Sequence, residues 1–394
     1  MRQQRIQAAI RRSNDLLEVP WGPAPETAHA PRRCFAIGDP QTSRERFFAV
    51  LAHHDLLGDD GMLAPDEMLI SMGDHFDYDG EPAEVGREGL AILRWLAEHP
   101  SEQAPILAGN HDVCRVMELA PLGDEDFAEA RVMAAALEVA RRRGEDVTAR
   151  ERIFFERFPP LPSPGVAVRD FLSYAEPQRT LVQALLLAGR MTLAVAAQLP
   201  DGREVLLTHA AVTRRELALL EPVSESPRDI AVALNEMLAM AVREIRPHWE
   251  AGEYFRPLSL APVHIAGTAG QEGGGLLYHR PANPERLHAD HAWEFHPVRP
   301  RRFDPRTLPL GLVQVCGHTG HRKCVRELGD WVGSSAREMK QGGIRTLCAD
   351  THRVSYEYGL VEAHADLAVV YMIDATMHAT APATYPLFRL GAPG

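Results

Sequence analysis

Short apolar runs that end abruptly in polar residues recur five times along the chain. Each run is four or five residues long and has the length and composition of a buried strand. The runs are 34–37, 68–72, 105–108, 205–208 and 312–316. Because α/β sheets gather functional groups beyond the carboxyl ends of their strands, we expect the five polar clusters to share one crevice.

The segments between the runs agree with this pattern. Thr42 and Glu45 have the spacing of a capping box, which predicts a helix directly after the first polar cluster. Residues 85–98 carry apolar side chains at helical spacing and predict a crossover helix between the second and third strands. Residues 193–199, a Pro-Asp-Gly turn and the fourth run predict a hairpin. Two further strands are predicted at 346–348 and 367–373.

Two regions lie outside this pattern. Residues 113–190 include a strongly helical stretch at 127–143 and a proline-rich corner, which predict a helical insertion or cap on the main domain. Residues 280–309 are rich in Pro, Arg and His and predict a long surface loop. We expect an N-terminal helical extension, 1–30, followed by one domain, 31–394.

Composition and charge restrict the partners. The 394 residues carry a formal net charge of −12, which disfavours binding to a nucleic-acid polymer or to an anionic membrane. The five cysteines form no C-x-x-C pair and their number is odd, so neither a disulfide framework nor a zinc ribbon is predicted. No stretch approaches the roughly 20 apolar residues of a membrane-spanning helix, and no secretory leader is recognised. We expect a cytoplasmic protein without nucleic-acid or membrane partners.

The polar clusters combine the side chains of a metal site. In chain order they are Gly38-Asp39, Gly73-Asp74-His75-Phe76-Asp77, Gly109-Asn110-His111-Asp112, Thr208-His209 and Gly317-His318. Each cluster alone is a weak signal, because an Asp after Gly at a strand end is usually a turn residue. The ordered set is far more specific. Carboxylate, amide oxygen and imidazole donors suit Mn, Fe, Zn or Mg, and two such ions close together activate water and neutralise phosphate charge.

This ordered set resembles the motifs of the calcineurin-like metallophosphoesterases. The resemblance is greatest to the phosphoprotein-phosphatase branch with its bacterial Shewanella-like and diadenosine-tetraphosphatase-like relatives. It runs from about residue 33 to about residue 375, with the 113–190 insertion outside it, and it is strongest between Gly73 and His111. It implies that residues 31–394 form a catalytic domain of the α+β class, folded as a four-layer αββα sandwich. It also implies two metal ions that share one Asp ligand, and a metal-bridging hydroxide as the nucleophile.

The resemblance also implies a role for each matching residue. The implied ligands, from the first metal through the shared aspartate to the second metal, are Asp39, Gln41, Asp74, Asn110, His209 and His318. His111 is implied as the acid that protonates the leaving oxygen, and Asp77 as the residue that orients it. A carboxylate bonded to an imidazole fixes the tautomer and favours the protonated ring, which suits this role.

The chain departs from the family pattern at three positions. Gln41 stands where the family has His, so either its amide oxygen binds the first metal weakly or it turns away and water completes the shell. Tyr78 and Ala108 replace two phosphate-binding arginines of the protein phosphatases, which weakens the case for a phosphoprotein substrate. Arg280 lies in a Leu-Tyr-His-Arg segment that resembles one in the bacterial relatives. It is predicted to bind phosphate, with a solvent-facing loop charge as the alternative.

Five other histidines are expected to play no direct part. His75 is predicted near the site but outside the ligand set, and His321 is predicted either behind the ligands or exposed. The loop residues His288, His291 and His296 are predicted to be solvated.

The predicted function is that of a dinuclear metal-dependent phosphoesterase with two divalent ions, Mn most favoured and Fe, Zn or Mg as alternatives. The expected reaction is hydrolysis of a phosphomonoester, on a phosphoprotein or on a small phosphorylated molecule. A dinucleotide polyphosphate hydrolase or a phosphodiesterase on the same site is the first alternative. The second is a metal-binding regulatory scaffold with weakened catalysis, which the retention of His111 and Asp77 disfavours.

Overall fold

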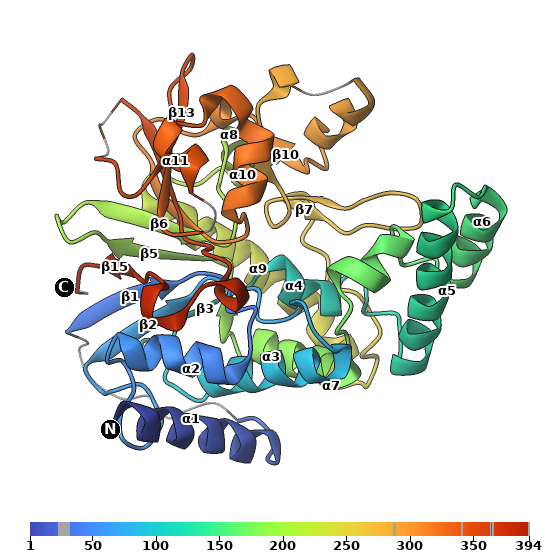
Figure 1. Cartoon of the computed structure of the whole chain (residues 1–394), viewed down its shortest axis with the longest axis horizontal. Helices are drawn as coiled ribbons and strands as arrows, with labels where there is room; N and C mark the ends of the chain where they lie inside the picture. Colours follow the sequence, from blue (N-terminus) through green and yellow to red (C-terminus); the bar gives the residue numbers. More distant parts are fainter. Residues whose placement is uncertain (23–31, 287–288, 340–341, 363, 365, 393–394) are drawn as a thin grey trace.

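Two mixed β-sheets form the centre of the computed structural model (Figure 1). The structure describes residues 1–22, 32–286, 289–339, 342–362, 364 and 366–392. The first sheet has the order β15-β1-β2-β3-β4, with β1 (Arg33–Ile37), β2 (Glu67–Ser71), β3 (Ile106–Leu107), β4 (Met191–Thr192) and β15 (Phe388–Leu390). The second has the order β13-β12-β14-β11-β6-β5, with β5 (Ala194–Gln198), β6 (Glu204–Thr208), β11 (Val313–Cys316), β12 (Arg345–Ala349), β13 (Val354–Tyr358) and β14 (Ala368–Met372).

Parallel pairing aligns the carboxyl ends of the strands that carry the polar clusters. In the first sheet β1, β2 and β3 run parallel, and in the second β6, β11 and β14 run parallel. The five predicted strands are all present, and the predicted hairpin is the antiparallel pair β5–β6. They divide between two sheets, however, so the shared crevice lies where the strand ends of both sheets meet.

An apolar core lies between the two sheets. It joins Ala36, Ile70 and Leu107 of the first sheet to strand residues of the second such as Leu207 and Val315. The alternation of strand side chains places Ile37 and Leu69 in another cluster with helices α2 (Arg44–His53) and α3 (Pro82–Ala97). Leu347 and Val370 belong to a third cluster with helices α10 (His321–Leu328) and α11 (Ser334–Glu338). The mixed α/β architecture is compatible with the predicted α+β class.

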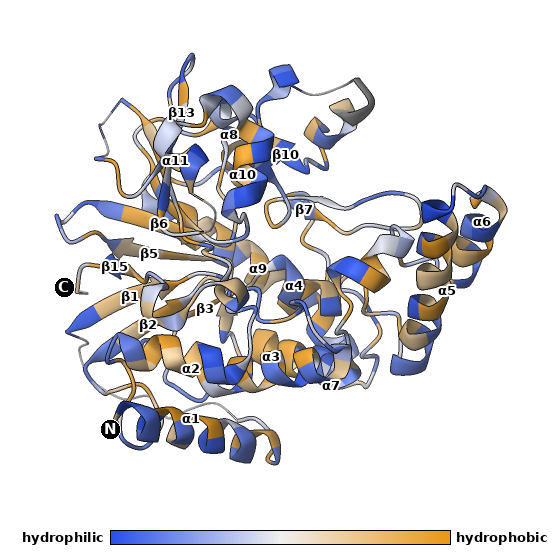
Figure 2. Cartoon of the chain, in the orientation of Figure 1, coloured by the Kyte–Doolittle hydropathy of each residue, from blue (hydrophilic) through white to orange (hydrophobic). Residues whose placement is uncertain are grey.

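The helices surround the sheets and show banded hydropathy, as expected for helices with one buried face (Figure 2). Their bounds are α1 (Arg2–Leu17), α2 (Arg44–His53), α3 (Pro82–Ala97), α4 (Asn110–Val113), α5 (Asp124–Arg142), α6 (Thr148–Arg157), α7 (Glu176–Leu187), α8 (Arg214–Leu220), α9 (Pro227–Glu250), α10 (His321–Leu328) and α11 (Ser334–Glu338). The predicted start of α2 is off by one residue, because the Ser43 hydroxyl, not Thr42, accepts a hydrogen bond from the Arg46 amide and caps the helix.

The segment from 113 to 190 contains α5 and α6, which project away from the sheets (Figure 1). These helices have their own apolar cluster, which includes Phe127, Phe154 and Phe158. A π-helical turn (Val166–Asp170) follows and leads the chain back toward α4.

The region predicted as one long loop contains two short strands, β9 (Arg280–Pro281) and β10 (Arg302–Phe303), which pair in parallel. A second short pair joins β7 (His264–Ile265) to β8 (Gly274–Gly275). Among the described residues, no helix is long and apolar enough to cross a membrane.

Candidate metal and phosphate site

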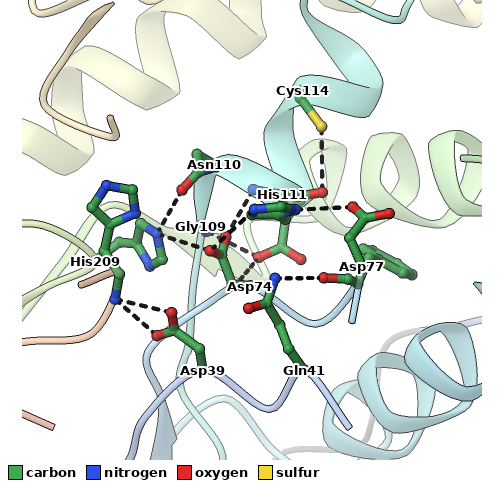
Figure 3. Close-up of polar contacts among 12 residues, drawn as sticks. Asp39, Gln41, Asp74, Asp77, Gly109, Asn110, His111, Cys114 and His209 are labelled. Atoms are coloured by element: carbon green, nitrogen blue, oxygen red, sulfur yellow. Dashed lines mark hydrogen bonds and ion pairs between the residues drawn. The ribbon is translucent and has the colours of Figure 1, made fainter. Parts of the chain in front are cut away.

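The structure brings the predicted ligands together at the carboxyl ends of the strands. Asp39 and Asp74 follow β1 and β2, and Asn110 begins α4 beyond β3. His209 directly follows β6, and His318 lies two residues after β11. Figure 3 shows Asp39, Asp74, Asn110 and His209 lying close together.

Three buried side chains form the tightest group. The potential ligand atoms of Asp74, His209 and His318 all lie within 4.8 Å of one another. His209 Nε2 lies 3.4 Å from Asp74 Oδ2 and 3.1 Å from Asn110 Oδ1. These four residues correspond to the predicted second metal position together with the predicted bridge.

Backbone carbonyls set the orientation of both imidazoles. His209 Nδ1 donates to the Met72 carbonyl at 2.8 Å, which leaves Nε2 directed toward the group. His318 Nε2 lies 3.0 Å from the Tyr278 carbonyl, and the opposite nitrogen, Nδ1, is buried with no hydrogen-bond partner among the described residues. A buried imidazole nitrogen without a partner, with the other nitrogen bonded to a carbonyl, is the arrangement of a metal-ligating histidine.

The charges in this group favour a bound cation. Burial alone would lower the pKa of His209, but the negative charges of Asp74 and Asp39 raise it to about 9. Burial and the nearby charge of Asp374 raise the pKa of Asp39 well above its ordinary range. Carboxylates that face each other in this way are stabilised by a positive ion between them.

The predicted first metal position is more open. The carboxylate of Asp39 accepts the His318 amide proton, with both oxygens 3.0 Å from the nitrogen. Gln41 Nε2 donates to the Phe76 carbonyl at 2.7 Å, so the amide oxygen faces the carboxylates of Asp39 and Asp74 (Figure 3). Gln41 is half-buried, and with Asp39 it lines a cavity of about 430 Å³. The amide is therefore held in the orientation that a ligand would require.

Asp374 also lines this cavity, and the sequence analysis did not identify it. It follows β14, and its Oδ1 accepts the Thr376 amide proton at 2.9 Å. A Cβ atom on Gly320 would lie 3.2 Å from Asp374 Oδ2, so this carboxylate occupies space that a side chain at 320 would need. The parallel arrangement of β14 and β11 places Asp374 at the same edge as His318.

The backbone around the site has left-handed conformations at three side-chain-bearing residues. Asp74, Asp77 and His318 have φ values of 58°, 66° and 62°. Such conformations cost of order 1–3 kcal/mol each and cluster at functional sites. The glycines of the motifs allow close approach: a Cβ on Gly109 would lie 2.2 Å from Asp74 Oδ1, and one on Gly317 would lie 2.2 Å from Asp39 Oδ1.

His111 and Asp77 form the predicted pair. His111 Nδ1 donates to Asp77 Oδ2 at 2.9 Å, and its Nε2 lies 4.0 Å from Asp74 Oδ2. The ring thus points its second nitrogen toward the group formed by Asp74, His209 and His318. It lies beside that group and is not one of the closely spaced ligand atoms.

Asp77 is held by two further residues that the sequence analysis missed. Arg115, one helical turn after His111, donates to Asp77 Oδ2 at 2.8 Å, and Ser173 donates to Oδ1 through its amide and its hydroxyl at 3.0 and 2.6 Å. Burial would raise the pKa of Asp77, but Arg115 and the hydrogen bonds lower it to about 2. Phe171 packs edge-on against the His111 ring at 5.1 Å. The 113–190 segment therefore supplies part of the support for His111.

His75 and Asp112 form a buried support beneath the site. His75 bonds Asp112 Oδ1 through Nδ1 and the Ser71 hydroxyl through Nε2, both at 2.9 Å. Asp112 Oδ2 accepts the amide protons of Asp74 and Gly109, each at 2.9 Å. His75 is thus near the site and outside the ligand group, and Asp112 fixes the loops that carry Asp74 and Asn110.

Three of the remaining histidines were expected in the surface loop. His296 Nδ1 accepts the amide protons of Val298 and Arg299. His288 lies outside the described residues, and the side chain of His291 is also outside them. His321 is buried, and its two ring nitrogens bond the Tyr356 hydroxyl and the Met339 carbonyl at 3.0 and 3.1 Å. Neither nitrogen of His321 is directed to the group formed by Asp74, His209 and His318.

Arg280 lies beside the predicted acid. With Asn110 and His111 it lines a cavity of about 230 Å³. Its side chain is half-buried, so it is not a fully solvent-facing charge. Tyr78 and Ala108, the two positions without the expected arginines, offer no positive charge to the site. Tyr78 stacks with His378 at 6.4 Å between ring centroids, and Ala108 is fully buried.

No family model matches the chain, and comparisons with curated proteins and with solved structures also give no match.

Proposed function

We propose that the chain is a metal-dependent phosphoesterase. The observation that carries the proposal is the convergence of Asp74, His209 and His318 beside an oriented His111–Asp77 pair. Two sheets with a shared apolar core and helices on their outer faces support the four-layer αββα sandwich that the motif resemblance implies.

The donor set fits two divalent ions. Asn110, His209 and His318 would hold one ion, Asp39 and Gln41 the other, and Asp74 would contact both. Two observations support this assignment: Nδ1 of His318 is buried without a hydrogen-bond partner among the described residues, and the negative charge of Asp374 lies near the carboxylate of Asp39. When bound, such ions supply an activated water at neutral pH and neutralise charge on the phosphoryl group.

The residues of the chain supply binding and proton transfer. Arg280 contacts the phosphoryl oxygens, because its guanidinium lines the cavity that contains Asn110 and His111. His111 Nε2 delivers a proton to the leaving oxygen, while Asp77 accepts from Nδ1 and fixes the ring. Arg115 and Ser173 keep Asp77 in place, since each of its carboxylate oxygens accepts at least two hydrogen bonds.

Hydrolysis of a phosphomonoester is the favoured reaction. Hydrolysis of a dinucleotide polyphosphate or of a phosphodiester at the same site is the alternative. The support around Asp77 favours an enzyme over a metal-binding scaffold. It orients His111, a residue outside the closest ligand group, and a scaffold has no use for an oriented acid.

The proposal is tested by a panel of substrates with Mn added. The panel contains aryl phosphates, phosphopeptides, dinucleotide polyphosphates and cyclic nucleotides. We expect hydrolysis of at least one phosphate ester, abolished by chelation and restored by Mn. Absence of any metal-dependent hydrolysis across the panel would contradict the proposal.

The role of His111 is tested separately with His111→Ala. This variant is expected to retain its metals while activity falls by about 10²–10⁴-fold, the usual contribution of a general acid. The loss should be smaller for nitrophenyl phosphate than for an alkyl phosphate, because the nitrophenolate needs little protonation. Equal losses on both substrates would exclude the acid role.

A further inference from the structure

A second cation lies next to Arg280. Lys323, on α10, lines the 230 Å³ cavity together with Arg280, Asn110 and His111. It also lines the 430 Å³ cavity that contains Asp39. Lys323 therefore lies at the boundary between the predicted acid and the predicted first metal position.

Four cations line the 230 Å³ cavity, and they differ in their partners. Arg169 pairs with Asp170 at 2.9 Å, and Arg301 pairs with Glu272 at 3.2 Å. Within the described part of the chain, neither the Arg280 guanidinium nor the Lys323 ammonium forms an ion pair or a hydrogen bond, and Arg280 Nε is buried without a partner. Two of the four cations are thus without a counter-ion.

The proximity of these two cations is unfavourable in the absence of an anion. The charge of Arg280 lowers the pKa of Lys323, and burial together with the charge of Arg301 lowers the pKa of Arg280 to about 10. Like charges that share a site destabilise each other's charged forms. A bound anion would relieve this repulsion and satisfy the Arg280 donors.

Resting on the proposed function, we propose that Arg280 and Lys323 form a subsite for the doubly charged phosphate of a monoester. Arginine offers a planar fork to two phosphate oxygens, and lysine adds a compact charge with three donors. A diester carries only one negative charge and has a second ester group, so it should bind to the two cations more weakly than a monoester.

The first test measures binding of inorganic phosphate to the Mn-loaded protein by calorimetry. Lys323→Gln is expected to weaken binding about 10-fold or more, the order expected for a lost hydrogen bond to a charged group. Arg326→Gln is the matched control, because Arg326 is exposed on the same helix and pairs with Glu327. The control should bind phosphate like the wild type. Equal binding by Lys323→Gln and the wild type overturns the subsite.

The second test compares nitrophenyl phosphate with bis(nitrophenyl) phosphate. For Lys323→Gln we expect kcat/KM on the monoester to fall about 10–100-fold, and on the diester by less than about 3-fold. Equal losses on both substrates would overturn the selectivity. If neither the wild-type protein nor a variant hydrolyses either ester, the full substrate panel decides the proposed function, whereas phosphate calorimetry still decides the subsite. Circular dichroism of each variant confirms that it is folded.

Discussion

The two predicted metal positions differ in how firmly their ligands are held. At the second position, His209 and His318 are buried, each ring is oriented by a backbone carbonyl, and both converge with Asp74. At the first position, Asp39 is buried, but Gln41 and Asp374 are half-buried at a 430 Å³ cavity. The closest ligand group in the described chain includes the second position and the bridge, and Asp39 is outside it.

This difference implies unequal affinities and unequal metal preferences. Two imidazoles with an amide oxygen and a carboxylate suit Zn or Fe as well as Mn, whereas a site with oxygen donors alone favours harder ions such as Mg and Mn. A preorganised site also binds more tightly, because little ordering of side chains remains to be done. The second position should therefore fill first. The first should depend on added Mn.

The largest effect is expected for Asp74→Asn, because Asp74 is the residue proposed to contact both ions. One neutralised ligand weakens both ions, so the variant should lose bound metal and activity together. Elemental analysis after gel filtration measures the metal content. Two metals per chain in the variant would remove Asp74 from its bridging role and would break the comparison between the two positions.

His318→Ala should separate the positions. Its imidazole belongs to the second position, whereas the 318 amide that bonds Asp39 remains. We expect the affinity for the tighter ion to fall by more than roughly 10–100-fold, the loss typical when a residue that only hydrogen-bonds to a metal ligand is removed. The weaker Mn site should persist in a titration followed by electron paramagnetic resonance. Loss of both sites in a folded variant would show that they are not independent.

Much of this arrangement could be predicted from the sequence, because local patterns encode strands and the residues that end them. The apolar runs predicted β1, β2, β6 and β11 closely, and the motifs predicted which side chains converge. Their division between two sheets depends on long-range pairing, which no local run specifies. Ser173 reaches Asp77 across 96 positions, and Lys323 follows no recognisable motif, so neither had a local signal.

Asp374 is different, because a signal was present. Residues 367–373 were predicted as a strand, and Asp374 follows that strand as Asp74 follows β2. The rule that functional groups follow parallel strands applies to it as well. Because Gly320 has no side chain, the carboxylate of Asp374 has room to reach the edge of the cavity.

Asp374→Asn is therefore expected to weaken Mn binding at the first position about 10-fold, with little change at the second. The physical reason is the loss of one negative charge that faces Asp39. Asp350→Asn is a matched control, since Asp350 follows β12 much as Asp374 follows β14. Among the described residues, its side chain accepts hydrogen bonds only from amides of its own turn. Identical Mn titrations for Asp374→Asn and Asp350→Asn would exclude Asp374 from the first position.

The smallest and most discriminating change is Gln41→His. The wild-type amide donates to the Phe76 carbonyl and presents its oxygen to the carboxylates, so it supplies a weak, hard donor. A histidine at this position can donate one ring proton to the same carbonyl and present the other nitrogen. We expect the first position to bind more tightly by several-fold and to shift its preference from Mn toward Zn or Fe. Competition titrations of the wild type and the variant with Mn and Zn measure both quantities. If the wild type and the variant have indistinguishable affinities and metal preferences, water and not residue 41 completes the coordination of the first ion. The difference between the two positions must then come from Asp39 and Asp374 alone.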